Sequence, residues 1–364
     1  MNQQYLLDII SRRKDGSATV LVRAVLTCLS LPYRIAIWIR NWRYDTGTGV
    51  KHVDATVISV GNLTTGGTGK TPHIAMLARK LSNRSNNIAI VSRGYGSQDG
   101  KPNDEAIELS WQVDVPHFQN ADRVAAAELA IKDTSANCIL LDDGFQHRRL
   151  ARQLDIVLID ATCPFGYGAL LPRGLLREPI SSLKRADVVV LTRRNLVTDE
   201  TRQQILDKVE IANPDVVVAE TKITVDGLID SERNRHSLSI LHGPVLAVCG
   251  IGNPAGFYKT LSDSSVDVCG EIAFNDHHAF TEQDIRQIAA AVHESSATCI
   301  VCTLKDLVKI KRQQIGSAPI YALSIKTEFM SGKSEFDRLI DETIDASVID
   351  RVERGLASSD VNAA

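Results

Sequence analysis

The chain has 364 residues, of which 44% are hydrophobic, and it carries 41 Lys and Arg residues against 44 Asp and Glu residues. This composition is typical of a globular protein with a substantial buried core, and it excludes a disordered chain and a polytopic membrane protein. The net charge of −3 gives no global reason to expect a nucleic-acid partner.

The N-terminal segment, residues 1–45, is the first feature in chain order. Residues 1–16 mix acidic and basic side chains and lack the uninterrupted apolar stretch of a signal peptide. The apolar stretch that follows is interrupted by Arg23, Pro32 and Arg34, which a bilayer-spanning helix would not readily carry. Two interpretations remain: helical segments lying at a membrane surface, or an amphipathic helix pair packed on the body of the protein.

Apolar, strand-like runs then alternate with helical patterns. Strands are expected in 55–61, 87–96, 136–144, 154–162 and 186–194, and helices in 71–82 and 121–133. Strands that are apolar on both faces and alternate with helices predict an α/β fold, a parallel sheet flanked by helices.

The same alternation restarts after residue 230. Runs at 244–254, 257–274, 284–296, 298–310 and 318–329 predict a second, smaller α/β domain. Residues 219–227 are expected to form a short ribbon between the domains. The predicted boundaries are therefore 46–222 for the first domain, 223–349 for the second, and 350–364 for a polar, flexible tail.

Seven cysteines are spread along the chain, mostly in apolar, strand-like runs. We expect them to be small core residues of a protein from a reducing compartment. Cys299 and Cys302 have the spacing of a metal or redox motif, but no second Cys or His pair lies at a useful distance. On a strand this spacing directs the two side chains to opposite faces, so we predict core packing for both.

The segment 58–72 contains the strongest motif, because an apolar run leads into glycines and closes on Gly69, Lys70 and Thr71. The P-loop pattern G-x-x-x-x-G-K-[ST] would need a glycine at Thr64, so the strict pattern fails. Its physical requirements are still met, since the glycines allow a tight path whose N–H groups point inward and a helix starts at once. The alternative is a merely glycine-rich turn. The candidate nucleotide-binding residues are Thr65, Gly66, Gly67, Thr68, Gly69, Lys70 and Thr71.

A P-loop needs an acidic residue at the end of a nearby strand to position Mg²⁺. Asp142 and Asp143 follow an apolar run, and two adjacent carboxylates repel each other unless a cation lies near them. One of the two could instead cap the following turn. With the Thr71 hydroxyl, the pair predicts a magnesium site, and the loop is expected to bind Mg-ATP.

Several further segments carry a resemblance to a known family. In chain order they read "GNLTTGGTGKTP", "SRGYG", "NDEAIEL", "LDDGFQHRRL", "LLPRGLLREP", "RADVVVLTR" and "FNDHHAF". Together they resemble the tetraacyldisaccharide 4′-kinase family of Gram-negative bacteria, from about residue 20 to about residue 325. The resemblance implies transfer of the ATP γ-phosphate to the 4′-hydroxyl of an acylated glucosamine disaccharide 1-phosphate, at the cytoplasmic face of the inner membrane.

The resemblance also implies catalytic residues. Asp104 of "NDEA" matches the residue that accepts the proton of the sugar hydroxyl, with Asn103 where the family has glycine. His277 matches the histidine that pairs with this Asp, although Asn275 stands where proline is usual and His278 is adjacent. Lys70 would act on the transferred phosphate. Because the Asp and the His fall in different predicted domains, we expect domain closure over ATP.

The substrate side is implied by the same resemblance. Arginine suits a sugar phosphate because its planar fork binds two oxygens at once. For each residue a structural ion pair or cap remains the alternative. The candidate substrate-binding residues are Arg93, Tyr95, Arg123, Gln146, His147, Arg177 and Glu178.

A tetraacylated substrate cannot leave the bilayer without exposing its chains, at about 0.8 kcal/mol per CH₂. The resemblance therefore favours peripheral membrane contact for residues 1–45. The expected anchors are Tyr33, Trp38 and Trp42 with Arg23, Arg34, Arg40 and Arg43.

Two rival functions are a P-loop ATPase or GTPase switch without a lipid acceptor, and a membrane-surface scaffold with a degenerate P-loop. The switch variant of the loop carries an extra lysine where this chain has Thr65. Intact Lys70, Thr71, Asp142 and Asp143 disfavour the scaffold. The oligomeric state is not predicted.

Overall fold

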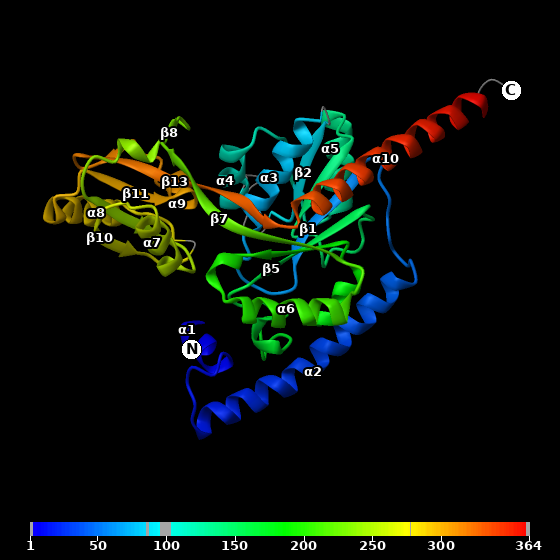
Figure 1. Ribbon diagram of the computed structural model, residues 1–364, viewed down its shortest axis with the longest axis horizontal. Helices are drawn as coiled ribbons and strands as arrows, with labels where there is room; N and C mark the ends of the chain where they lie inside the picture. Colours follow the sequence, from blue (N-terminus) through cyan, green and yellow to red (C-terminus); the bar gives the residue numbers. More distant parts are fainter. Residues whose placement is uncertain (1–2, 85–86, 95–102, 277, 362–364) are drawn as a thin grey trace. The chain divides into compact units, whose positions relative to one another are not determined.

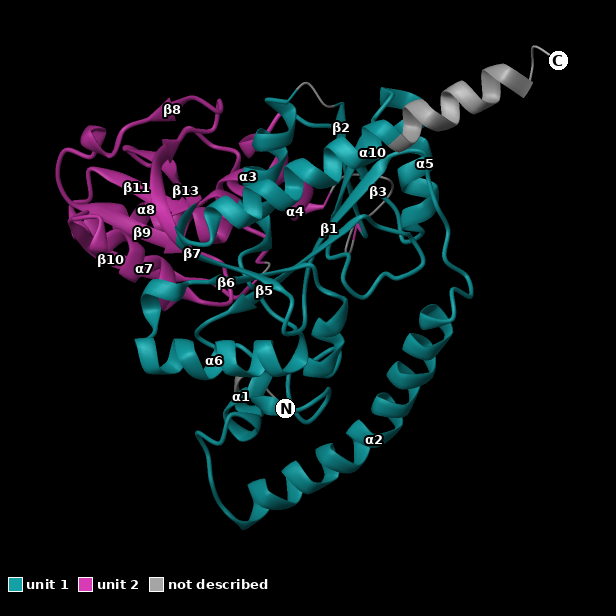
Figure 2. Ribbon diagram, turned by 45° about the vertical axis from the view of Figure 1, so that its right-hand side comes forward, with its two compact units in different colours: residues 1–93, 115–222, 328–364 teal, residues 94–114, 223–327 magenta. Residues whose placement is uncertain are grey.

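The structure is a computed structural model that describes residues 3–84, 87–94, 103–276 and 278–361 (Figure 1). Two predicted site residues, Tyr95 and His277, lie outside the described residues. The chain forms two compact units (Figure 2). Unit 1 comprises Met1–Arg93, Val115–Lys222 and Glu328–Ala364, and unit 2 comprises Gly94–Asp114 and Ile223–Thr327.

Unit 1 is built on a parallel sheet whose strand order is β7-β6-β5-β1-β4-β2-β3. Every residue of β1, β2, β5 and β6 is buried, as expected for a parallel sheet covered on both faces. The strands are β1 (Thr56–Asn62), β2 (Ile88–Ser92), β3 (His117–Gln119), β4 (Cys138–Asp142), β5 (Leu154–Asp160), β6 (Val188–Thr192) and β7 (Val217–Ile229), the last of which continues into unit 2.

Helices cover both faces of this sheet. Val57, Ile139 and Val157 share one face by register, and that face packs against α5 and α6. The helices α3 and α10 contact β1 and are tied together by Lys80, whose Nζ lies 3.1 Å from Asp337 Oδ1. The helices of unit 1 are α1 (Gln3–Ile10), α2 (Ser17–Asp45), α3 (Lys70–Ser82), α5 (Arg123–Thr134), α6 (Asp199–Ala212) and α10 (Lys333–Val361).

The parallel strands of unit 2 lie in the order β10-β9-β11-β13. One core cluster packs α4, α8 and α9 on one face, and another packs α7 on the other face. Cys302 lies in the first cluster and Cys299 in the second, so their side chains point to opposite faces as predicted. The elements are α4 (Asp104–Gln112), β8 (Arg235–His236), β9 (Val245–Cys249), α7 (Pro254–Asp263), β10 (Val268–Ala273), α8 (Glu282–Ser295), β11 (Cys299–Thr303), α9 (Leu304–Ile310), β12 (Gln314–Ile315) and β13 (Ala318–Ser331).

Parallel strands flanked by helices in both units confirm the predicted α/β fold with a second, smaller α/β unit. The division of the chain differs from the predicted boundaries in two places. Residues Gly94–Asp114 belong to unit 2, because α4 packs Ile107 and Trp111 on the core of that unit. Residues Glu328–Ala364 belong to unit 1, and α10 is assigned to Lys333–Val361, where a flexible tail was expected from residue 350.

The N-terminal segment forms one short and one long helix, α1 and α2, at the periphery of unit 1 (Figure 1). Pro32 is accommodated inside α2 without ending it. Among the described residues α2 is the one helix long and apolar enough to cross a membrane, by length and composition only. It is attached to unit 1 along one side, where Tyr33 donates to the carbonyl of Arg177 at 2.8 Å.

Candidate functional site

The glycine-rich loop lies between β1 and α3, as the P-loop prediction requires. Gly66 and Gly69 have φ of 113° and 83°, a left-handed backbone that glycine adopts without steric cost. Gly69 is the N-cap of α3, so Lys70 and Thr71 form the first turn of that helix. The positive end of α3 therefore faces the loop, which favours a bound anion.

Side chains from elsewhere in unit 1 hold the carbonyl groups of this loop. Arg193 donates to the carbonyl of Gly67 at 3.0 Å, and the Thr192 hydroxyl donates to that of Thr68 at 3.0 Å. His73 contacts the carbonyl of Gly69 at 2.7 Å through Nδ1. These contacts hold the loop through its carbonyl oxygens. None of the three side chains was predicted from the sequence.

His73 is 1% exposed and bridges the loop to β7, because its Nε2 lies 3.0 Å from the Thr221 hydroxyl. A neutral ring can donate from Nδ1 to Gly69 and accept at Nε2 from Thr221. Burial lowers the pKa of His73 to about 4, with Arg193 adding to the effect and the bond to Gly69 opposing it. The ring is therefore neutral at pH 7.

The acidic pair lies at the end of β4, the strand that pairs with β1. Asp143 has φ of 52°, in the left-handed region that Asp tolerates better than most residues. A Cβ on Gly144 would lie 2.5 Å from the Ser59 hydroxyl and 2.7 Å from the Leu141 side chain, so only glycine fits. This tight turn places Asp143 beside the P-loop.

Asp143 is flanked by two cations. Lys70 Nζ lies 3.5 Å from its Oδ1, and Arg177 Nη1 lies 3.0 Å from Oδ1 and 2.8 Å from Oδ2. Burial by itself would raise the pKa of the Asp143 carboxyl, but Lys70 and Arg177 outweigh burial and hold the pKa below its usual value. Asp143 is therefore ionised at neutral pH, next to the P-loop lysine.

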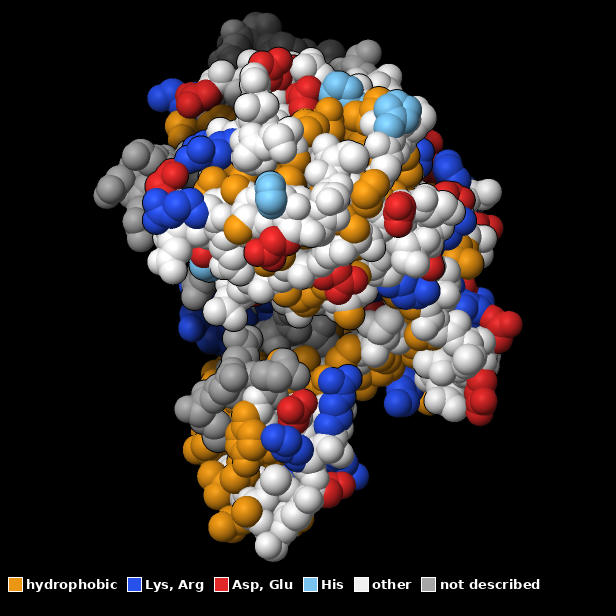
Figure 3. Space-filling view, turned by 90° about the vertical axis from the view of Figure 1, so that its left-hand side faces the viewer, with side chains coloured by type: hydrophobic (Ala, Val, Ile, Leu, Met, Phe, Trp, Pro, Cys, Tyr) orange, Lys and Arg blue, Asp and Glu red, His pale blue; other side chains and the backbone are white. Residues whose placement is uncertain are grey.

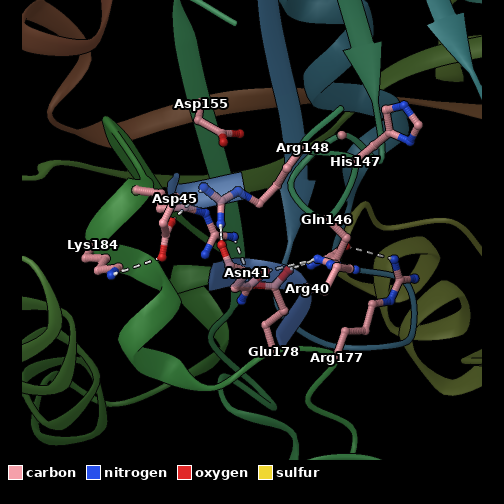
Figure 4. A network of polar contacts seen from close by, with 12 residues as sticks. Arg40, Asn41, Asp45, Gln146, His147, Arg148, Asp155, Arg177, Glu178 and Lys184 are labelled. Carbon is pink, nitrogen blue, oxygen red and sulfur yellow. Dashed lines mark hydrogen bonds and ion pairs between the residues drawn. The ribbon is translucent and has the colours of Figure 1, made fainter. Parts of the chain in front are cut away.

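Gln146 and His147 follow on the same turn. Gln146 donates to the carbonyl of Asn62 at 2.8 Å, and its Oε1 accepts from Arg177 at 3.4 Å (Figure 4). It therefore joins Arg177 to the end of β1. Burial lowers the pKa of His147 to about 4, and Arg123 adds to the effect.

Of the two other predicted arginines, Arg123 lies near the acidic pair and Arg93 lies near Arg123. Arg123 begins α5 and is 7% exposed, and it interacts electrostatically with Asp143, with Asp142 and with Arg93. Arg93 follows β2 and is exposed. The structure thus gathers Lys70, Thr71 and the two carboxylates with Arg123, Gln146 and Arg177 at the carboxyl ends of the strands of unit 1, where parallel sheets bind ligands.

Glu178 departs from its prediction. Its side chain is fully buried, and it accepts from Arg40 at 2.7 Å, from Asn41 at 3.0 Å and from Arg185 at 2.9 Å. Both carboxylate oxygens are occupied by protein donors. Glu178 is therefore a structural ion-pair residue between α2 and the body of unit 1, and we do not retain it as a substrate ligand.

Asp104 lies in unit 2, at the start of α4, where the Asn103 side chain caps the helix by accepting from the amide of Ala106 at 3.0 Å. Its Oδ2 is 3.0 Å from Nζ of Lys309 on α9. Lys309 also donates to the carbonyl of His278 at 3.3 Å. Asp104 and the segment around position 277 thus belong to one unit, so the prediction that they lie in different domains was wrong.

The side chain of His278, the alternative to His277, is held by contacts with neighbouring residues of its own loop and of α8. Its Nε2 lies 3.0 Å from Asp284 Oδ2, and its ring stacks on Phe274 with the centroids 4.7 Å apart. Phe280 meets the ring edge-on. These contacts show that His278 packs the loop before α8. They do not bear on His277, which stays the residue that the motif assigns as partner of Asp104.

The oxygen donors of Thr71, Asp142 and Asp143 suit magnesium better than a metal that is held by protein ligands alone. No group of three or more His, Cys, Asp or Glu side chains that could hold a metal ion occurs in the part of the chain that the structure describes. Mg²⁺ is usually held by one or two carboxylates, phosphate oxygens and water. The Thr71 hydroxyl at the helix start and the carboxylates of Asp142 and Asp143 match that donor set.

A glycine loop between the first strand and a helix, with Lys-Thr at its end and an acidic pair on the adjacent strand, defines a P-loop nucleotide-binding protein. The model of the tetraacyldisaccharide-1-P 4′-kinase family matches residues 22–345. The chain belongs to this family.

Named relatives agree with this assignment. A tetraacyldisaccharide 4′-kinase of Halothermothrix orenii is 37% identical over 347 residues, which cover 86% of this chain and 89% of the relative. One from Geobacter metallireducens is 35% identical over 333 residues, covering 86% of this chain and 96% of the relative. Among solved structures, the "apo" form of LpxK from Aquifex aeolicus in complex with ATP superposes with a TM-score of 0.72 at 27% identity, covering 89% of this chain and 99% of that one.

Proposed function

We propose that this protein is an ATP-dependent kinase that transfers the γ-phosphate to the 4′-hydroxyl of a tetraacylated glucosamine disaccharide 1-phosphate, a step of lipid A biosynthesis. The observation that supports it most directly is the contact of Lys70 and Arg177 with one carboxylate, Asp143, beside a glycine loop at a helix start. In a chain of this family, that arrangement provides two cations and an acidic residue where a triphosphate and its metal are held. The switch function, which needs no acceptor, is not favoured by the family.

The P-loop residues Thr65–Thr71 would bind the phosphates of ATP. Their carbonyl oxygens are held from behind by Thr192, Arg193 and His73, so the loop keeps its path when an anion enters. Lys70 would neutralise charge on the transferred phosphoryl group. A preorganised loop stabilises developing charge without reorganising during the reaction.

Magnesium would be held by Thr71, Asp142 and Asp143, and bound Mg²⁺ supplies charge neutralisation of the phosphates. Asp143 is kept ionised by its two cationic neighbours, so it is ready to accept a metal at neutral pH. Lys70 and Arg177, which flank Asp143, would add positive charge beside the metal and the phosphate oxygens.

The acceptor hydroxyl needs a base, and Asp104 is the residue we assign to it, with His277 as its partner. The ion pair with Lys309 orients the Asp104 carboxylate in unit 2. On the substrate side, Arg93, Tyr95, Arg123, Gln146, His147 and Arg177 would bind the sugar and its phosphate.

Peripheral contact with the cytoplasmic face of the inner membrane is proposed through α2. Figure 3 shows hydrophobic side chains gathered in the lowest part of the molecule, at the height where Figure 1 has the N-terminal half of α2. Such a surface on a water-soluble body marks an interaction with an apolar phase. The exposed large apolar residues of this helix are Val20, Leu21, Val25, Leu29, Leu31, Ile35, Trp38, Ile39 and Trp42.

Not every expected anchor faces outward. Tyr33 and Arg40 contact the body of unit 1, and Arg23 pairs with Asp15 at 2.7 Å. Trp38 and Trp42, which are 67% and 58% exposed, remain the aromatic candidates for the membrane surface.

The deciding experiment is a mass-spectrometric assay for a phosphate added to the acylated disaccharide, run beside ADP release with and without detergent-dispersed acceptor. We expect a mass gain on the disaccharide and ADP release that depends on acceptor. ADP release at the same rate without acceptor, and no phosphorylated disaccharide, would establish the switch instead. The Lys70→Ala variant is the control for background turnover.

A further inference from the structure

One loop in unit 1, residues 170–178, is bonded to the P-loop on one side and to α2 on the other. On the P-loop side, the amide of Thr65 donates to the carbonyl of Leu175 at 2.8 Å, and the amide of Arg177 donates to that of Leu63 at 2.7 Å. These bonds flank an isolated antiparallel bridge between Thr64 and Leu176. Residues 170–178 therefore lie directly against the P-loop and are hydrogen-bonded to its backbone.

The other side of the same loop is held by α2. The Ser30 hydroxyl donates to the carbonyl of Leu170 at 3.2 Å, and the Tyr33 hydroxyl donates to the carbonyl of Arg177 at 2.8 Å. Tyr33 thus contacts the backbone of the residue whose guanidinium lies on Asp143. One residue separates the helix from the site carboxylate.

The next residue, Glu178, forms the main junction (Figure 4). Its fully buried carboxylate accepts from Arg40 and Asn41 of α2 and from Arg185 of the short 3₁₀ helix Ile180–Arg185. Burial alone would raise the pKa of the Glu178 carboxyl, but Arg185 and Arg40 outweigh it, so the pKa lies below its usual value and the group is charged. A buried charge that depends on donors from two elements is satisfied only when both elements are in place.

The junction also reaches the acidic turn by a second path. The Arg185 guanidinium lies 4.4 Å from the centre of the Phe145 ring, two residues after Asp143. A Cβ on Gly61 would lie 2.6 Å from Phe145, so β1 and this turn are packed without slack. The position of α2 is therefore coupled to the turn that carries the acidic pair, as well as to Arg177.

We propose that α2 positions the catalytic site of this kinase: Tyr33, Arg40 and Asn41 hold the Arg177–Glu178 segment so that Arg177 lies on Asp143 beside the P-loop. These three are positioning residues that act through Arg177 and touch no reacting atom. The inference rests on the proposed kinase function. It means that a helix proposed to meet the membrane also sets the geometry of phosphoryl transfer, so that a chain with α2 displaced would bind ATP but transfer phosphate poorly.

The sharpest test is Tyr33→Phe, which removes one hydroxyl and keeps the ring. Losing one hydrogen bond corresponds to about a three- to tenfold effect, so we expect kcat/KM for the acylated disaccharide to fall by about that factor. The dissociation constant for ATP should stay unchanged, and the melting temperature should fall by no more than a few degrees. Arg40→Gln, which removes a donor of Glu178, should act in the same direction. Matched controls are Tyr5→Phe on the exposed side of α1 and Lys184→Ala, whose ion pair with Asp45 is long and exposed.

A double-mutant cycle tests the route. In an Arg177→Ala background, Tyr33→Phe should change kcat/KM less than twofold, because its effect passes through Arg177. Equal effects in both backgrounds would overturn the proposal, since Tyr33 would then act directly on the acceptor or on the fold.

Hydrogen exchange supplies a readout that needs no activity. Amides in peptides covering 63–66 and 175–178 should exchange faster in Tyr33→Phe than in the wild type and in Tyr5→Phe. Unchanged exchange in these peptides would also overturn the proposal. If the wild-type protein phosphorylates no disaccharide, the proposed function fails, and the exchange comparison still decides whether α2 holds the loop.

Discussion

Asp104 on α4 and Lys309 on α9 form an ion pair, with Oδ2 and Nζ 3.0 Å apart. Both residues belong to unit 2, whereas Lys70, Asp143 and Arg177 belong to unit 1. The residue assigned as base is therefore carried by a different unit from the residues assigned to ATP. A lysine for which the sequence suggested no role orients that base.

The first prediction concerns Asp104. Asp104→Ala should lower kcat by about 10²- to 10⁴-fold, the usual contribution of a positioned base, with ATP affinity nearly intact. Glu105→Ala is the matched control, since it removes the neighbouring exposed carboxylate of α4. Steady-state kinetics and calorimetric titration with ATP measure both quantities, and a large loss of ATP affinity would show that the assigned role is wrong.

The second prediction concerns magnesium. Chelation should abolish phosphate transfer, and Thr71→Ala should raise the Mg²⁺ concentration needed for half-maximal rate, because one of few protein oxygens for the ion is lost. Thr48→Ala, in an exposed loop, is the control and should match the wild type. A Thr71→Ala protein with an unchanged Mg²⁺ dependence would remove Thr71 from the metal site.

The third prediction concerns membrane contact. Replacing Trp38 and Trp42 by Gln should reduce the fraction that sediments with anionic vesicles, with ATP affinity unchanged. Ile211→Gln on α6 is a control, because Ile211 is 84% exposed but lies outside α2. Equal vesicle binding by the tryptophan variant and the wild type would refute the role of this face.

Deleting residues 1–45 is a poorer test of membrane contact. The deletion would remove two of the three donors of buried Glu178, so stability and site geometry would change together with membrane binding. Point substitutions on the exposed side of α2 separate these effects.

The fourth prediction is a pH dependence of stability. The pKa of His73 is about 4 in the folded protein against an ordinary value of 6.5, so between these values the unfolded chain binds a proton that the folded chain does not. The stabilisation from neutral His73 is complete above pH 6.5 and is lost as the pH falls toward 4, by up to about 3 kcal/mol. In His73→Gln, denaturant unfolding should show a shallower fall over that window. Parallel pH curves for the two proteins would exclude this role.

The sequence predicted the parts of the site that depend on neighbours along the chain. The apolar runs predicted strands, and the glycines with Lys70 and Thr71 predicted a loop at a helix start, which the structure has between β1 and α3. Two carboxylates at the end of an apolar run predicted an acidic strand end, which lies on β4 next to β1. These features are local because strand periodicity and loop chirality are properties of a few consecutive residues.

The sequence did not predict which side chains would be engaged in contacts with the protein itself and so be withdrawn from the site or the membrane surface. Glu178 and Arg177 are adjacent in one motif, yet Arg177 reaches Asp143 whereas Glu178 is buried against α2. Adjacent side chains point in different directions, so a motif alone does not show which of them faces the site and which is buried. Tyr33 and Arg40 were likewise expected at the membrane and instead contact unit 1.

The sequence by itself determined the P-loop, the acidic pair, the α/β class and, through its resemblance, the family. Only the tertiary structure decided that α4 belongs to unit 2, that His73 and Arg193 support the P-loop, and that α2 is bonded to the loop bearing Arg177. The physical reason is the range of the interactions. Backbone preference and periodicity act over a few residues. Hydrogen bonds, ion pairs and core packing join residues more than one hundred positions apart, as the hydrogen bond from Tyr33 to Arg177 shows with a separation of 144.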